Sequence, residues 1–136
     1  MKIFICCSKA FYGKVQPIAT RLESEGHLIT FPNSFDDPNQ ELRFKSRGHA
    51  EHSKWKDEKL RLSVNKVKDV DAMLVLNLDK RGLKDYIGGA TFLEMFEAYK
   101  GNKKIFLWNP IPLGILHDEI VGMKPILING NLGLVK

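Results

Sequence analysis

The chain has 136 residues, of which 43% are hydrophobic, and its formal net charge is +5. This length suits one compact domain, and the hydrophobic share excludes a disordered chain. No apolar run approaches the roughly 18–20 residues that cross a bilayer, and the chain opens on a strand pattern without a signal-peptide layout, so we expect a cytoplasmic protein without membrane contact.

Strand and helix patterns alternate along the first part of the chain. The sequence predicts a strand over Lys2–Cys6, a loop over Cys7–Gly13, a helix over Lys14–Glu25 and a strand over His27–Phe31. The helix is predicted from apolar residues at helical spacing, namely Val15, Ile18, Ala19 and Leu22. The adjacent Cys6 and Cys7 are expected to be buried apolar residues, or else to supply a reactive thiol at the strand end, and a disulfide between them is not expected.

The middle of the chain carries the whole excess of positive charge. Residues 43–68 hold nine Lys or Arg and three Asp or Glu. Residues 33–50 form the least regular stretch, which contains a turn signal at Asp36-Asp37-Pro38-Asn39, and a helix is predicted over Glu51–Lys68. Trp55 is expected to bury its ring against the sheet. The basic residues either form a solvated helix face or attract phosphates or nucleic acid.

The second half continues the alternation of strands and helices. The predicted elements are a strand over Asp71–Asn77, a helix over Ala90–Lys100, a strand over Lys104–Trp108, a short helix near Leu116–Val121 and a last strand over Pro125–Ile128. This pattern predicts one three-layer α/β/α domain over residues 1–136, Rossmann-like or flavodoxin-like, with a parallel sheet of about five strands. Ligands of such sheets bind beyond the carboxyl ends of the strands.

The most informative stretch is Tyr86–Glu94, which places two glycines at the mouth of a predicted helix and Glu94 in its first turn. Glycines let a ligand approach the backbone closely, and helix amides favour anions. Two interpretations of Glu94 stay open. Thr91 and Glu94 have the spacing of a capping box, in which Glu94 would bond to the Thr91 amide. Alternatively, Glu94 attacks or stabilises the anomeric carbon of a sugar as an N-glycosidic bond breaks.

The pattern Gly-Gly-x-Thr-x-x-Glu, followed by Ala98 and by Lys104-Ile105, resembles the nucleoside 2-deoxyribosyltransferase-like superfamily, which includes deoxynucleoside 5′-monophosphate N-glycosidases. The Ser-containing loop Cys7-Ser8-Lys9 and the stretch Leu22–Thr30 also resemble this family, so the similarity extends over most of the chain. Gly88–Thr91 is similar as well to the glycine motif of LOG-type phosphoribohydrolases, but is one residue short of it.

The resemblance implies an enzyme that cleaves or transfers at the N-glycosidic bond, with Glu94 as nucleophile. The sequence departs from the family at two positions. Gly88 stands where the transferases have an aspartate and the monophosphate hydrolases a serine, and Asp85 is the upstream acid that would compensate. Ser63 stands where the family has a second carboxylate.

The predicted catalytic residues are therefore Glu94 and Asp85. The predicted substrate-binding residues come from the loops that follow the strands and from the helix entrance: Ser8, Lys9, Phe11, Tyr12, Asn77, Gly88, Gly89, Thr91 and Asn109. The expected ligand is a small nucleoside or nucleotide, and no metal or cofactor is expected. Relatives in the superfamily complete their sites across subunit contacts, which implies a homo-oligomer.

Two other functions stay open at this point. The absence of acids at Gly88 and Ser63 is compatible with a non-catalytic nucleotide-binding or sensing module on the same fold. The basic residues 43–68 are compatible with a protein that binds nucleic acid.

Overall fold

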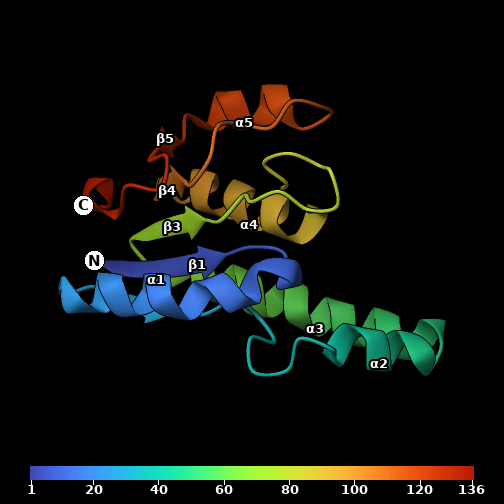
Figure 1. Ribbon diagram of the computed structural model, residues 1–136. Helices are drawn as coiled ribbons and strands as arrows, with labels where there is room; N and C mark the ends of the chain where they lie inside the picture. The colour runs from blue at the N-terminus through green and yellow to red at the C-terminus, as the bar shows by residue number, and fades with distance from the viewer.

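The computed structural model describes residues 1–136, which form a five-stranded parallel sheet between two layers of helices (Figure 1). The strands lie in the order β2-β1-β3-β4-β5. Their bounds are Lys2–Cys6 for β1, Leu28–Thr30 for β2, Ala72–Val75 for β3, Lys104–Leu107 for β4 and Ile126–Leu127 for β5. The predicted three-layer α/β fold with a parallel sheet is confirmed.

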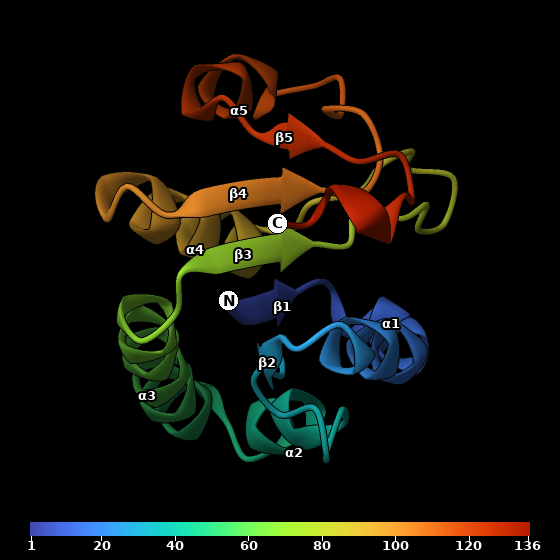
Figure 2. The same ribbon diagram turned by 90° about the vertical axis from the view of Figure 1, so that its left-hand side faces the viewer.

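Helices cover both faces of the sheet (Figure 2). α1 lies on one face, and α3, α4 and α5 lie on the other. The five α-helices are α1 (Tyr12–Ser24), α2 (Gln40–Ser46), α3 (His49–Lys68), α4 (Gly89–Lys100) and α5 (His117–Met123), and two 3₁₀ turns span Lys9–Phe11 and Leu132–Leu134. None of these helices has the length and apolar character that crossing a membrane requires.

The central strands β1, β3 and β4 are buried on both faces apart from the exposed first residues Lys2 and Lys104, and alternate residues divide the core into two halves. Ile3 and Ile5 of β1 pack toward α1, whereas Phe4 and Cys6 pack toward α3 and α4. The parallel register places Ile3 beside Ala72 of β3 and Ile29 of β2. Burial on both sides explains why these three central strands are continuous apolar runs after their first residues, whereas the edge strands β2 and β5 are partly or largely exposed.

Helix α2 is the main departure from the predicted elements, because it occupies part of the stretch that was expected to be irregular. It has no buried residue, and it packs chiefly along α3. A short helix with so little buried surface has a weak apolar pattern, and the turn signal at Asp36–Asn39 directly before it favours a loop.

The order in which strands are added to the sheet reverses at β1. The chain places β2 on one side of β1 and then places β3, β4 and β5 on the other side. This is the topological switch point, where parallel sheets of this kind bind ligands. In Figure 1 the N-terminal part of α3 and the whole of α2 extend beyond the carboxyl ends of the strands. They reach past the same edge from which the β1–α1 and β3–α4 loops emerge.

Candidate functional site

A cavity of about 260 Å³ lies at the switch point. Its wall combines the loop after β1, the start of α4 and the side of α3. The β1 loop supplies Cys7, Ser8, Lys9 and Tyr12, and the α4 entrance supplies Gly88, Gly89, Ala90, Thr91 and Glu94. The third side of the cavity comes from the segment after β2 and from α3. These two segments are distant in sequence from the other two sides, and folding brings all three together.

Glu94 is partly buried in the cavity wall and is held by α3 rather than by its own helix. The Ser63 hydroxyl donates a hydrogen bond to Glu94 Oε2 across 2.7 Å. The capping box expected from Thr91 and Glu94 is wrong, because α4 begins at Gly89 and its N-cap residue Gly88 makes no side-chain cap. Glu94 therefore lies in the second turn of α4, where its side chain reaches α3.

Ser63 is itself held by the segment that follows β2. Asn33 Nδ2 donates to Ser63 Oγ at 2.7 Å and to the Lys59 carbonyl at 3.1 Å. The other atom of this amide, Asn33 Oδ1, is buried and has no hydrogen-bond partner. Asn33, Ser63 and Glu94 thus form one line of hydrogen bonds across three segments of the chain.

Burial raises the pKa of the Glu94 carboxyl above its usual range. The Ser63 hydrogen bond and the charges of Lys66 and Lys56 act in the opposite direction, because they favour the ionised form. Burial also lowers the pKa of Lys66, whose Nζ donates to the Phe31 carbonyl at 2.9 Å. The carboxylate is therefore desolvated but remains close to cations, which is typical of a group prepared for chemistry.

The two cysteines are buried and free. Burial, with a further contribution from the negative charge of Glu94, raises the pKa of Cys7 to about 12 and that of Cys6 well above its usual value. Both thiols are neutral at physiological pH. Their burial as free thiols agrees with the expectation that they are buried small residues, and the Cys6 thiol also hydrogen-bonds to the Glu94 carboxylate and favours its ionised form.

Four lysines line the cavity, namely Lys9, Lys56, Lys59 and Lys80, against two carboxylates, Glu41 and Glu94. Lys80 Nζ donates to Ser8 Oγ at 3.1 Å and lies 4.7 Å from the centre of the Tyr86 ring. Lys56 approaches Glu41 at 3.4 Å. The cavity consequently carries an excess of positive charge beside an aromatic and a carboxylate.

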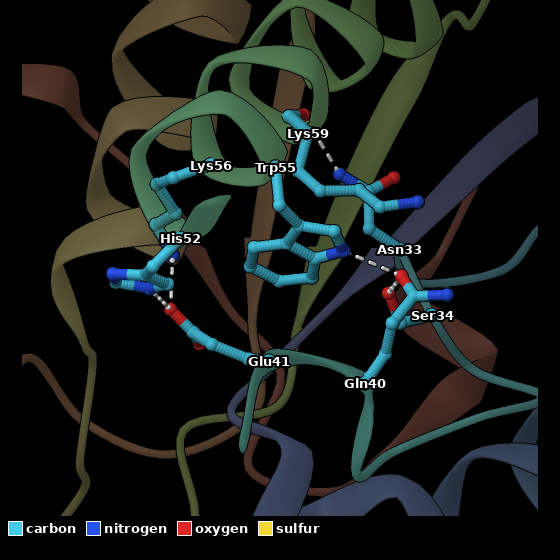
Figure 3. Close-up of polar contacts among 8 residues, drawn as sticks. All are labelled: Asn33, Ser34, Gln40, Glu41, His52, Trp55, Lys56 and Lys59. Carbon is cyan, nitrogen blue, oxygen red and sulfur yellow. Dashed lines mark hydrogen bonds and ion pairs between the residues drawn. The ribbon is translucent and has the colours of Figure 1, made fainter. Parts of the chain in front are cut away.

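Helix α2 closes one side of the cavity through polar contacts with α3 (Figure 3). Trp55 Nε1 donates to Gln40 Oε1 at 2.7 Å, and His52 Nε2 lies 2.9 Å from Glu41 Oε2. The Trp55 ring also stacks on Phe44 of α2, with 6.0 Å between the ring centres. Trp55 was expected against the sheet. It is buried against α2 instead, because the N-terminal half of α3 extends beyond the strands.

Seven of the predicted site residues line this cavity: Ser8, Lys9, Tyr12, Gly88, Gly89, Thr91 and Glu94. Gly89 leaves open space at the position of a side chain, since a Cβ added there would meet no atom within 4 Å. The backbone conformation of Gly89 is not one that requires glycine. Its lack of a side chain therefore enlarges the cavity rather than relieving strain.

The other four predicted residues lie outside the cavity wall. Phe11 is buried in the core beneath α1. Asp85 is buried in a left-handed conformation with φ of 54°, where its amide donates to Asp79 Oδ1. Asn77 and Asn109 hydrogen-bond to each other through side chain and backbone, which joins the ends of β3 and β4. Their polar groups are used within the protein.

Several cavity residues were not predicted, and most of them come from α3 and from the segment before it: Asn33, Glu41, Trp55, Lys56, Lys59 and Ser63. For the part of this wall that α3 supplies, the sequence signal was the concentration of positive charge in residues 43–68. That charge is partly directed at the cavity, through Lys56 and Lys59. Ser63 had been noted only as the residue at the place of a family carboxylate.

The structure contains no group of three or more His, Cys, Asp or Glu side chains that could hold a metal ion. Comparison with protein-family models gives no match for this sequence, and comparison with curated proteins gives no significant match.

Proposed function

We propose that the cavity binds a nucleoside or nucleotide and that Glu94 acts at the anomeric carbon of its sugar to break the N-glycosidic bond. The observation that carries this proposal is the position of the Glu94 carboxylate, which lines a cavity at the switch point among four lysines and two tyrosines. The resemblance to the nucleoside 2-deoxyribosyltransferase-like superfamily, which rests on the glycines and Glu94, supports the same chemistry.

The lysines favour a phosphorylated ligand over a free nucleoside. Lys9, Lys80 and Lys59 have no carboxylate partner within ion-pair distance, whereas Lys56 shares Glu41 with His52. The first amides of α4 also lack an intrahelical acceptor and lie at the cavity wall. A phosphate group would satisfy both kinds of donor, and Tyr12 or Tyr86 would contact the base or the sugar.

The reaction is a displacement at C1′. A Glu94 oxygen forms a bond to C1′ as the C1′–N bond breaks, and the electron pair of that bond leaves with the nucleobase, which takes up a proton from solvent water. A water oxygen then attacks C1′ and loses a proton to solvent as the bond from C1′ to the Glu94 oxygen breaks, which frees the carboxylate and gives hydrolysis. A second nucleobase in place of water gives transfer.

The test is release of free base from a panel of nucleosides and nucleoside 5′-monophosphates, followed by chromatography. The proposal predicts base release by the wild type from at least one member of the panel and loss of release in Glu94→Ala. Equal inactivity of the two proteins across the whole panel, or equal activity, would contradict a catalytic role of Glu94.

A second candidate is a protein that binds nucleotides without turnover. It is favoured by Ser63, which replaces a carboxylate of the related enzymes, so that Glu41 is the only acid besides Glu94 in the cavity wall. A nucleotide that raises the melting temperature but yields no free base would support it. Nucleic-acid binding through residues 43–68 ranks lower, because Lys56 and Lys59 of this region line the cavity.

Homo-oligomer formation is part of the proposal. Leu93, Phe96 and Tyr99 on the outer side of α4 are about half exposed, and Phe96 and Tyr99 border a shallow groove against Met123 of α5. Burial of these side chains against a second copy would remove the apolar surface from water. Light scattering coupled to gel filtration should give a mass above 15.5 kDa, which Phe96→Glu should return to that of a monomer.

A further inference from the structure

We infer that Asn33 and Ser63 form a positioning pair that fixes the orientation of the Glu94 carboxylate. The consequence for turnover rests on the proposed function, whereas the effect on the carboxylate itself does not. The three residues come from the segment after β2, from α3 and from α4, and two hydrogen bonds of 2.7 Å join them in a line.

The amide of Asn33 has one orientation in this arrangement. The Lys59 carbonyl can only accept a hydrogen bond, and it lies 3.1 Å from the Asn33 nitrogen. The NH₂ group must therefore point toward Lys59 and Ser63, since the amide oxygen has no hydrogen to give. This orientation leaves Asn33 Oδ1 buried without a partner, which is uncommon for a buried acceptor and indicates that the two donated bonds decide the orientation.

The direction of the Ser63 hydrogen follows from that of the amide. A serine hydroxyl carries a single hydrogen and two acceptor sites. Asn33 donates to an acceptor site of Ser63 Oγ, so the single hydroxyl hydrogen of Ser63 is free to point at Glu94 Oε2, which accepts it. The carboxylate thus receives a directed hydrogen bond at Oε2, which fixes its orientation in the cavity wall.

The surroundings of Glu94 make this bond important, because few other groups favour its ionised form. Lys66 and Lys56 on α3 and a hydrogen bond from the Cys6 thiol act in this direction. The neutral thiol of Cys7 and the phenol of Tyr12 border the same carboxylate from the β1 side. Burial opposes ionisation, so removal of the Ser63 hydroxyl should raise the pKa of Glu94 further.

The test compares Ser63→Ala and Asn33→Asp with the wild type, and Ser53→Ala is the matched control. Ser53 lies on the same helix and is exposed, outside the cavity wall. Asn33→Asp keeps the shape of the side chain but replaces the donor by an acceptor that competes with Glu94 for the Ser63 hydrogen. Circular dichroism establishes that each variant is folded.

The first readout is the titration of the Glu94 carboxyl carbon by NMR, which requires no turnover. We expect the midpoint to move to higher pH in Ser63→Ala and in Asn33→Asp and to stay at the wild-type value in Ser53→Ala. An unchanged midpoint in folded Ser63→Ala would overturn the inference, whatever the protein does with nucleotides. If Asn33→Asp does not fold, Ser63→Ala alone decides.

The second readout applies once the wild type is shown to release base. Loss of one hydrogen bond to a charged group should lower kcat of Ser63→Ala about 10- to 100-fold with little change in KM. The acidic limb of its pH–rate profile should move to higher pH. A profile with the wild-type acidic limb would contradict the positioning role, since a purely structural serine would alter stability without moving this limb.

Discussion

Ser63 donates its hydroxyl hydrogen to the carboxylate of Glu94 although 31 positions separate the two residues. The bond joins α3 to α4 at the cavity wall, and it takes the place of the local capping contact that the spacing of Thr91 and Glu94 favours. Because the Glu94 carboxylate is bound by Ser63 of α3, it points away from the N-terminal end of α4. This places Glu94 where a ligand in the cavity can reach it.

Glu94→Gln should abolish activity while making the protein more stable at neutral pH. The amide can still accept the Ser63 hydrogen bond but cannot attack carbon, so we expect base release to fall by a factor on the order of 10³ or more. Burial raises the pKa of Glu94 in the folded state, so the folded protein holds this proton to a higher pH than the unfolded chain. Stability is therefore lost as pH rises from the unfolded value of about 4.3 through the folded pKa, and the loss is complete above it.

Thermal unfolding at several pH values measures this effect. The melting temperature of Glu94→Gln should exceed that of the wild type at pH 8 and approach it at pH 3, where the wild-type carboxyl is protonated in both states. If Glu94→Gln instead melts at a lower temperature than the wild type at pH 8, burial of the ionised Glu94 carboxylate does not destabilise the folded protein.

Gly89→Ala should preserve the fold and weaken ligand binding. The backbone at Gly89 accepts any residue, and alanine favours a helix over glycine by up to about 1 kcal/mol, so stability should be equal or slightly higher. The new methyl group would occupy open space in the cavity wall. Calorimetric titration with a nucleoside 5′-monophosphate should show reduced affinity.

Gly13→Ala provides the matched control for this variant. Gly13 also lies in the first turn of a helix with free space around it, but outside the cavity wall. Its replacement should leave nucleotide affinity unchanged. Equal affinities of Gly89→Ala and Gly13→Ala would indicate that no ligand approaches the entrance of α4.

Lys59→Met and Lys80→Met should each weaken binding of a nucleoside 5′-monophosphate by about tenfold, because each removes one charge-assisted bond to phosphate. Affinity for the corresponding nucleoside should change much less. Lys54→Met is the control, since Lys54 is exposed on the same helix as Lys59 and does not line the cavity. If all three variants lose affinity equally, the charge acts at long range and not within the cavity.

Trp55→Phe should loosen α2 without unfolding the sheet. The substitution removes the 2.7 Å bond from Trp55 to Gln40, a loss of about 1 kcal/mol, and α2 has no buried residue to compensate. Hydrogen exchange should accelerate at residues 40–46 and remain slow in β1 and β3. Trp108→Phe, a change of the same kind at a residue that directly follows β4 and packs against the core cluster under α1, should leave exchange in α2 at the wild-type rate.

The sheet could be predicted because its strands are short apolar runs between clear helix signals. The β1 strand was predicted with the bounds that the structure shows, Lys2–Cys6. Helix α2 could not be predicted, because its stabilising contacts come from Trp55 and His52 of the next helix and leave no apolar stripe of its own.

In the candidate site as well, residues whose place follows from the local sequence could be predicted, whereas residues that are brought together by helix packing could not. Ser8 and Gly89 could be placed from their positions after a strand and before a helix. Asn77 satisfies the same rule, but its amide is used to join two loops of the protein. The line from Asn33 through Ser63 to Glu94 has no local signature, since only the packing of α3 on α4 brings these residues together.

A crystal structure of Glu94→Gln with an intact nucleoside 5′-monophosphate would show directly whether residue 94 faces the anomeric carbon of the bound sugar. We expect C1′ to lie about 3–3.5 Å from the side chain of residue 94, with the phosphate among the cavity lysines. A nucleotide bound elsewhere on the protein, or bound in the cavity with its C1′ turned away from residue 94, would contradict this expectation.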